Sequence, residues 1–441
     1  MYMLSKDTEL TPELLRKILD RFNTTDLIKR KRWKNYYDGK MDILQKQYSD
    51  PTKPCSRVVT NLCKVVADTY CGYIAGKPVT YTSNDNIDDI QEVINYNDDE
   101  SENTNWLLNA LIYGVGYELH WIDSDAQERY SQINPLNAIA IHAASLDNEL
   151  LYFIRWYDVS DFDDSDLLCV EVYDAYTKKT YHCHGLVGAL EFVNEEPHLF
   201  GDVPVSVFYL NEQEESIFNQ AISLNDAYNE LQSTEVDEYS ELCDSYLTMT
   251  GSFDTDTFAE EVPKMKENRV LILPDGATAN WLVKNTSDTQ ITNMLENIKK
   301  NIFKVTSAPD MSDENFMAQS GVAIKYKLVG FENKASAIVT NFTKAIQRRI
   351  ELICNILHLK AFDTVWRDVN INFVRNLPQD LTETITLVNS LKGSVSDATL
   401  LSQIPFITDV QSEIEAVREQ KANETSLYSF NFGDEDEELD N

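Results

Sequence analysis

The spacing of apolar residues changes along the chain, and these changes predict its organisation. Before residue 78 the spacing is helical, which predicts helices over residues 9–40 and 56–75, the first starting at Thr11 and Pro12. Six positions of the second helix are expected to be buried: Val58, Val59, Leu62, Val65, Val66 and Tyr70. A strand at 79–81 and a short helix at 106–113 follow.

From about residue 115 to residue 210 apolar and polar residues alternate, which is typical of half-buried strands. The predicted strands lie at 117–121, 151–157, 169–173, 180–184 and 203–209. Residues 174–179 are expected to form a hairpin connection. We therefore predict the α+β fold class, with an antiparallel sheet and no internal repeat.

The rest of the chain is mainly helical. A helix of about 30 residues, or about 45 Å, is expected from Ile217 to Tyr246. After a short mixed module with a strand at 270–273, a second helix covers 288–306 and is broken by Pro309. A helix of about 37 residues then runs from Val322 to His358, with Gly330 as a point where it could kink.

A strand at 369–373 and helices over 380–421 complete the prediction, before a tail in which six of the last eight residues are acidic. We expect the tail to be disordered. Within a small subunit a long helix can bury only one stripe of its own surface, and it needs further helices beside it. This plan therefore indicates a ring or a bundle of several chains.

Composition indicates a folded chain of 441 residues, 43% hydrophobic and 10% aromatic, long enough for two or three domains. No apolar run approaches the roughly 18 residues that cross a membrane, and the first residues do not resemble a signal peptide. Seven cysteines without a CxxC pair favour reduced thiols in the cytoplasm.

The net charge is −35, from 73 acidic and 38 basic residues, and it is unevenly distributed. Residues 1–60 hold 13 Lys and Arg against 8 Asp and Glu, a net of +5, so the remainder carries −40. The basic run at 29–34 is either a solvated helix or a contact for nucleic acid or for an acidic neighbouring subunit. The sequence leaves both open.

Motifs for catalysis or metal binding are incomplete. Residues 72–78 are one residue short of a phosphate-binding loop and end in Pro78, so a turn is expected there. Asp161, Asp163 and Ser165 begin like a calcium loop that lacks its glycine and its final carboxylate. His182 and His184 are expected on one face of a strand, as structural or surface histidines. We predict no catalytic residue, metal or cofactor.

Several segments resemble, in the same order, segments of the portal proteins of siphophages that infect Gram-positive bacteria. The early ones are Tyr36-Tyr37-Asp38-Gly39, Arg57-Val58-Val59-Thr60-Asn61, Lys64-Val65-Val66-Ala67-Asp68 and Gly76-Lys77-Pro78-Val79. The later ones are Val203-Pro204-Val205, Leu224-Asn225-Asp226-Ala227-Tyr228-Asn229, Ala308-Pro309-Asp310-Met311-Ser312-Asp313-Glu314 and Ser320-Gly321-Val322-Ala323-Ile324-Lys325-Tyr326-Lys327-Leu328. Together they cover about residues 30–360.

The resemblance implies a portal fold assembled as a ring of twelve subunits around an axial tunnel. Mapped onto this chain, the wing would be 1–211, the two stem helices 212–247 and 288–309, and the clip 248–287. A tunnel loop would fall at 310–321, a long helix and wing strand at 322–378, crown helices at 379–425 and the acidic tail at 426–441.

The resemblance also implies which residues meet DNA. The tunnel loop would present Asp313, Glu314, Asn315, Phe316, Met317, Ala318 and Gln319. Lys299, Lys300 and Lys304 are candidates to line the tunnel, although a solvated face or intersubunit salt bridges fit them equally. Twelve copies would total on the order of −400 formal charges, and an acidic wall that repels duplex DNA would let it slide.

The implied function is a passive channel for double-stranded DNA at the capsid vertex. The protein would be found in the virion, and in the host cytoplasm during assembly, and it would not associate with a membrane. Its implied partners are the terminase large subunit, a head-completion or adaptor protein, and the scaffolding and major capsid proteins. Two alternatives stay open: a Mg²⁺-dependent enzyme acting on nucleic acid, and an acidic scaffold with no DNA role.

Overall fold

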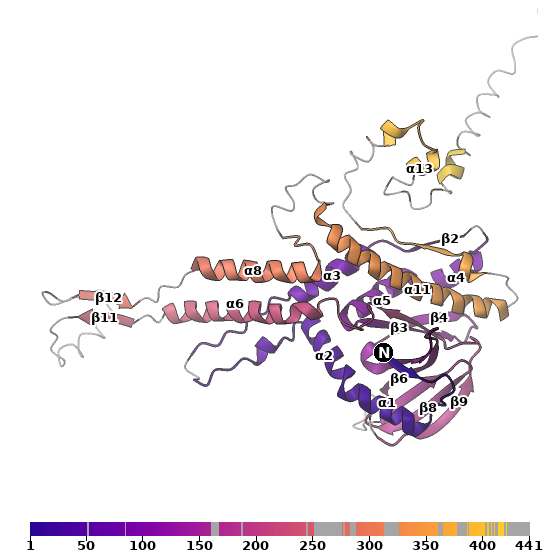
Figure 1. Ribbon diagram of the computed structural model, residues 1–441, viewed down its shortest axis with the longest axis horizontal. Helices are drawn as coiled ribbons and strands as arrows, with labels where there is room; N and C mark the ends of the chain where they lie inside the picture. The colour runs from indigo at the N-terminus through magenta and orange to yellow at the C-terminus, as the bar shows by residue number, and fades with distance from the viewer. Residues whose placement is uncertain are drawn as a thin grey trace, which may run out of the picture.

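The computed structural model describes most of the chain. It covers residues 1–250 except 51–52, 84, 160–166, 187 and 244–245, then 276, 278–282, 288–312, 326–359, 365–376 and scattered positions from 386 to 420. The predicted calcium-like start at 161–165, the strand at 270–273, the loop at 313–319 and the acidic tail lie outside the described residues. Figure 1 shows an α+β body from which helices α6 and α8 project side by side.

The N-terminal arm contains two helices where the sequence predicts one over 9–40. After strand β1 (Tyr2–Leu4), α1 (Pro12–Thr24) begins as expected, with the Thr11 side chain accepting a hydrogen bond from the Leu14 N–H. Thr25 leaves the helical conformation, and its N–H and hydroxyl both bond to the Arg21 carbonyl. Helix α2 (Asp26–Tyr37) therefore starts as a separate element after this one non-helical residue.

A six-stranded sheet forms the lower part of the body (Figure 1), in the order β1-β5-β6-β7-β8-β9. Its long strands are β5 (Ala138–Ala143), β6 (Leu150–Asp158), β7 (Leu167–Tyr173), β8 (Thr177–His184) and β9 (Glu191–Pro197). They pair antiparallel, and β1 pairs parallel with β5. The predicted hairpin connection is confirmed but is shorter, because β8 already begins at Thr177.

Besides the short β1, two long strands of this sheet escaped the prediction, because neither has an alternating environment. All six residues of β5 are buried, whereas all seven of β9 are exposed at the edge of the sheet. Both faces of β5 are covered: α1 packs on one face, and a three-stranded sheet packs on the other. That second sheet has the order β10-β3-β4, with β3 (Val115–Ile122), β4 (Glu128–Ile133) and β10 (Val205–Tyr209).

The largest core joins the helices of the upper body, which are α3 (Leu62–Ala75), α4 (Asp88–Tyr96), α5 (Asp99–Tyr113) and α11 (Val329–Leu359). The predicted helix 56–75 starts only at Leu62. Of the six positions predicted to be buried, Val65 is 45% exposed, and Val58 and Val59 are half-buried. Helix α5 starts seven residues before Trp106, with three acidic side chains in its first turn that suit the positive end of the helix dipole. Helix α4 was not predicted.

The projecting pair consists of α6 (Ile222–Cys243) and α8 (Asp288–Thr306). The second matches its predicted bounds. The first is shorter than predicted, 22 residues and about 33 Å, because Tyr246 begins β11 (Tyr246–Thr250). At the far end β11 pairs antiparallel with β12 (Thr278–Leu282) (Figure 1).

Helix α11 begins at Val329, after a turn at Leu328, and runs for 31 residues without interruption through Gly330. The part of its predicted range at 322–325 lies outside the described residues. Strand β13 (Asn370–Asn372) confirms the strand predicted there and pairs with β2 (Thr80–Thr82). The short helices are η1 (Asp42–Gln45), η2 (Pro135–Asn137), η3 (Asn219–Ala221), η4 (Trp366–Asp368) and α13 (Asp397–Leu401).

Candidate functional site

The root of the projecting pair is where segments far apart in the sequence meet. A segment of residues 56–62, extended as far as Asn61, lies along α6 and reaches the first residue of α3. Four α6 side chains spaced four residues apart accept hydrogen bonds from backbone N–H groups spaced two residues apart on this segment. The pairs are Asp237 with Ser56 (2.7 Å), Ser233 with Val58 (3.0 Å), Asn229 with Thr60 (2.9 Å) and Asn225 with Leu62 (3.0 Å).

We call these eight residues the side-chain ladder. Its four α6 members are buried, with at most 6% of each residue exposed. A buried backbone N–H must find an acceptor, and here the acceptors are side chains of another element. The ladder therefore explains why residues 56–61 are extended although their apolar spacing predicts a helix.

Asp237 is the charged member of the ladder. Burial alone would raise the pKa of its carboxyl, but hydrogen bonding from Ser56 and the nearby Lys46 ammonium outweigh burial and lower that pKa below its ordinary value. Lys46 also bridges to Glu230 at 3.1 Å. The ladder thus ends in a carboxylate that stays ionised at neutral pH.

Other hydrogen bonds hold α2 against the same root. The Tyr36 hydroxyl donates to Asp226 at 2.7 Å, and the Asn61 amide donates to the Tyr36 and Tyr37 carbonyls, both at 2.9 Å. The Tyr37 hydroxyl donates to Asp68 on α3 at 2.8 Å. Four segments singled out in the sequence, at 36–39, 57–61, 64–68 and 224–229, are therefore in direct contact.

The inner end of α8 is fixed separately. The Thr306 carbonyl accepts hydrogen bonds from the Tyr70 hydroxyl (2.9 Å) and the Lys334 ammonium (3.2 Å). The helix dipole favours a cation at a helix C-terminus, and Lys334 lies at that end of α8. Burial lowers the pKa of the Lys334 ammonium. Phe331 packs against Tyr70 and Tyr73, with ring centroids 4.6 Å apart in each case. Helices α3, α8 and α11 are thereby joined.

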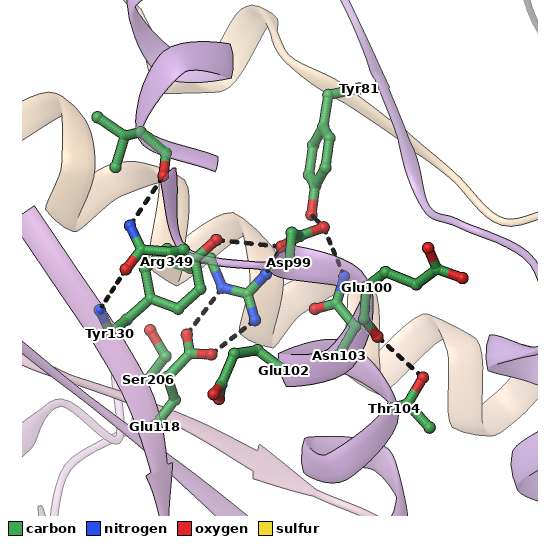
Figure 2. Close-up of polar contacts among 12 residues, drawn as sticks. Tyr81, Asp99, Glu100, Glu102, Asn103, Thr104, Glu118, Tyr130, Ser206 and Arg349 are labelled. Carbon is green, nitrogen blue, oxygen red and sulfur yellow. Dashed lines mark hydrogen bonds and ion pairs between the residues drawn. The ribbon is translucent and has the colours of Figure 1, made fainter. Parts of the chain in front are cut away.

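A buried cluster of charges, shown in Figure 2, holds α11 against the rest of the body. Arg349 donates to Glu118 on β3 through Nε (2.8 Å) and Nη2 (2.6 Å), and Nη1 pairs with Asp99 at the start of α5. Its guanidinium lies over the rings of Trp106 and Tyr130, 5.1 Å and 4.5 Å from their centroids. Arg349 and Glu118 are both 0% exposed.

His120 extends this cluster on β3. Its Nδ1 lies 3.1 Å from Glu128, and its Nε2 lies 3.4 Å from Glu118. Burial would lower the pKa of His120, but bonding to the two glutamates outweighs burial and raises it. Burial would likewise raise the pKa of Glu118, and the charge of Arg349 outweighs burial and lowers it. Arg349, Glu118 and His120 are buried and paired, so the cluster binds elements together, and Asp99, whose side chain is 11% exposed, also borders a cleft.

The predicted DNA-facing residues are only partly described. Asp313, Glu314, Asn315, Phe316, Met317, Ala318 and Gln319 lie outside the described residues. Lys299, Lys300 and Lys304 all lie on α8. Lys299 bonds to Asp310 at 2.9 Å, and Lys300 pairs with Glu296 on its own helix at 3.5 Å.

The turn expected at 72–78 is only partly confirmed, because the helix continues to Ala75. Residues 72–75 are the end of α3, and 76–79 form the connection to β2. On β8, Cys183 is buried in the core beside α1, whereas His184 is exposed on the other side of the strand. Six of the seven cysteines are described, all as free thiols.

A cleft of about 780 Å³ lies beside β2 and the first turn of α5, lined in part by Asp98, Asp99 and Glu100. Within the described ranges, no group of three or more His, Cys, Asp or Glu side chains is arranged to hold a metal ion. The Mg²⁺-dependent alternative therefore gains no candidate site from the part of the chain that the structure describes. No described helix is long and apolar enough to cross a membrane.

Sequence reasoning missed both the ladder and the Arg349 cluster. One feature could have indicated the ladder: Asn225, Asn229, Ser233 and Asp237 form a polar stripe at four-residue spacing, which a helix wholly packed on apolar neighbours would not carry. Arg349 likewise stands among Ile346, Ile350 and Ile353 on the buried side of α11. A charge inside an apolar stripe indicates a buried partner.

Comparison with known proteins covers nearly the whole chain. The family model described as "Phage portal protein, SPP1 Gp6-like" matches residues 16–427. The portal protein of Clostridium phage phiCD119 is 21% identical over 432 residues, which span 90% of this chain and 94% of that protein. The portal protein of Bacillus phage SPP1 is 21% identical over 465 residues, spanning 97% of this chain and 90% of that protein.

Proposed function

The chain belongs to the SPP1 Gp6-like phage portal proteins, and from this membership we propose that twelve copies form a ring at the capsid vertex. The ring encloses the channel through which double-stranded DNA enters during packaging and leaves during ejection. The protein is a component of the virion, and it assembles in the host cytoplasm.

The subunit divides into parts with different roles in this ring. The α+β body is the wing, α6 and α8 are the stem, and the module at 248–287, which contains β12 and most of β11, is the clip. The helices after residue 379 are the crown. The hydrogen bonds and core contacts at the root of α6 and α8 support this division, since they fix a projecting stem to a separate body.

The DNA contact is proposed to be weak and independent of sequence. Residues 313–319 form the loop that touches DNA, with Asn315, Phe316 and Met317 offering polar and apolar contacts without a fixed cation. The net charge of −35 per subunit supports sliding, because an acidic wall does not form the many phosphate contacts that would retain duplex DNA.

We assign no catalytic step to the subunit. Movement of DNA is driven by a separate motor, the terminase large subunit, which docks on the clip. After packaging a head-completion or adaptor protein takes the same place, and scaffolding and major capsid proteins surround the wing.

The observation that carries the proposal is the family match over residues 16–427. Native mass spectrometry with negative-stain images of the purified protein tests it. We expect rings of about twelve subunits with a central hole. In such a ring one surface of each subunit contacts a different surface of the next, and the series closes on itself. A protein that remains monomeric, even when the scaffolding protein of the same phage is added, would overturn the proposal.

A further inference from the structure

The two projecting helices carry opposite charge. Helix α6 contains six acidic residues and no basic one: Asp226, Glu230, Glu235, Asp237, Glu238 and Glu241. The last ten residues of α8 contain three lysines and no acidic residue. Opposite charges on two neighbouring helices usually pair with each other, but the described lysines of α8 do not follow this rule.

The α8 lysines are directed elsewhere. Lys299 pairs with Asp310, beyond the end of α8, and Lys300 pairs with Glu296 one turn earlier on the same helix. Lys300 is 70% exposed, and such a pair contributes little because water screens it. Lys304 is exposed and forms no ion pair with a described residue.

These lysines belong to a polar stripe along the free side of α8. Asn293, Asn297, Lys300 and Lys304 are all exposed, and their spacing places them on one helix face. Ile302 and Ile298, which pack into the core, lie on the opposite side. The stripe therefore points away from the body and stays uncovered within one subunit.

Helix α6 has a stripe with the same spacing. Ser223, Ala227 and Glu230 are exposed and Thr234 is half-buried, again at intervals of four, three and four residues. The Glu230 side chain is 55% exposed, and Lys46 Nζ lies 3.1 Å from one of its two carboxylate oxygens. Its carboxylate can therefore accept a second cation.

The two stripes also lie at similar heights along the pair. Glu230 is eight residues from the start of α6, about 12 Å, and Lys300 is six residues from the end of α8, about 9 Å. These two helix ends lie together in the same core, through Ile222, Ile302 and Phe303. If the ring axis runs parallel to the two helices, the rotation that relates neighbouring subunits does not change a residue's position along that axis. Glu230 of one copy and Lys300 of the next would then remain at similar positions along it.

We propose that Lys300 of one copy contacts the acidic outer face of α6, at Glu230, in the adjacent copy, with Lys304 one turn nearer the body on the same face of α8. This contact rests on the proposed ring and specifies its interface. It is heterologous, the α8 face of one copy against the α6 face of the next, which is the type of contact that closes into a ring. It also gives the α8 lysines a role between subunits and not on the tunnel wall.

Charge reversal tests the contact. Variant one carries Lys300→Glu and Lys304→Glu, and variant two carries Glu230→Lys and Thr234→Lys. Each places like charges across the proposed interface, which opposes association. We expect each alone to lose about tenfold or more of its rings in native mass spectra, while circular dichroism shows folded monomers.

Mixing the two variants gives the decisive result. In a mixture every favourable contact joins variant one to variant two, so rings should reappear with equal numbers of each and only even totals. An isotope label on one variant makes this visible. A chain with all four substitutions should form rings alone. The control, Lys344→Glu with Arg367→Glu, changes the charge as variant one does, on exposed residues of α11 and η4, and should form rings like the wild type.

The outcomes separate this contact from the ring itself. If the wild type forms rings and variant one does so equally well, the contact is wrong and the ring stands. If the folded variants fail to assemble when mixed, the contact is also wrong. If the wild type forms no ring with scaffolding protein present, the proposed function fails and the contact fails with it.

Discussion

Replacing Arg349 with Met removes the guanidinium and keeps an unbranched side chain in the same apolar surroundings. In the wild type three guanidinium nitrogens bond to Glu118 and Asp99, and the group lies over two aromatic rings. After the substitution Glu118 remains buried, with Gln132 at 3.2 Å and His120 at 3.4 Å as its polar neighbours.

The expected cost follows from the loss of one partner of a buried ion pair. Such a loss destabilises a protein by about 3–5 kcal/mol, because the remaining charge is left uncompensated. Part of this cost belongs to Glu118 alone. Adding Glu118→Gln to the Arg349→Met chain should therefore recover part of the free energy of unfolding, a coupling that a double-mutant cycle measures.

The neighbouring Arg348 provides a matched control. It pairs with Asp202 at 2.8 Å and with Glu351 at 2.7 Å, but its side chain is 22% exposed. Because water screens these pairs, we expect Arg348→Met to cost about 1 kcal/mol or less. Urea unfolding followed by tryptophan fluorescence suits the comparison, since Trp106 lies against the Arg349 guanidinium.

The reasoning would be refuted if the two Met variants unfolded at the same urea concentration with the same slope. It would also fail if Glu118→Gln lowered the stability of the Arg349→Met chain further, because the carboxylate would then not be the uncompensated group.

Three further outcomes are expected. Asn229→Ala removes a buried acceptor from the ladder and should lower the free energy of unfolding by about 1–3 kcal/mol. Amide hydrogen exchange in residues 56–62 should become faster. Thr234→Ala on the same helix should change neither the free energy of unfolding nor the exchange rates. The pKa of His120 is raised above 6.5, so its contribution to stability is complete below pH 6.5 and is lost as the pH rises through the pKa of the folded state. The difference in Tm between wild type and His120→Gln should therefore shrink from about pH 6 to about pH 9. A difference that stays constant with pH would contradict this. Gly114 and Gly201 both have positive φ, but a Cβ at Gly114 would lie 2.2 Å from the Glu214 backbone whereas Gly201 faces open space, so thermal melts should show a clearly larger loss for Gly114→Ala than for Gly201→Ala.

Periodicity predicted most of the elements whose two sides differ, although it missed α4, which buries Ile90 and Ile94 on one side. The bounds of α8 were confirmed, and the long helix ends within one residue of its predicted end, because each has one apolar stripe. Strands β5 and β9 were missed because their residues are, respectively, all buried and all exposed. In these two strands burial depends on what packs against the sheet. The local spacing of apolar residues carries no information about that packing.

The ladder shows a second limit. Residues 56–61 have the apolar spacing of a helix, but their N–H groups bond to α6 side chains about 170 positions later in the chain. A tertiary partner decided the local conformation, and no window around residue 58 includes that partner. Arg349 was missed for the same reason, since Asp99 and Glu118 lie more than 200 positions earlier.

The ladder also restricts how the length of this chain can vary. Four residues of helix advance about 6.0 Å, whereas two extended residues advance about 6.6 Å. The two repeats therefore drift apart by about 2 Å over the three intervals between the rungs, and a longer series would lose its hydrogen bonds. A single residue inserted between Asn225 and Asp237 would rotate the later acceptors away from the segment and shift every rung beyond it. Insertions and deletions between Cys243 and Asp288 leave the rungs untouched, so related chains can differ in size at the tip of the projection while its base keeps one length.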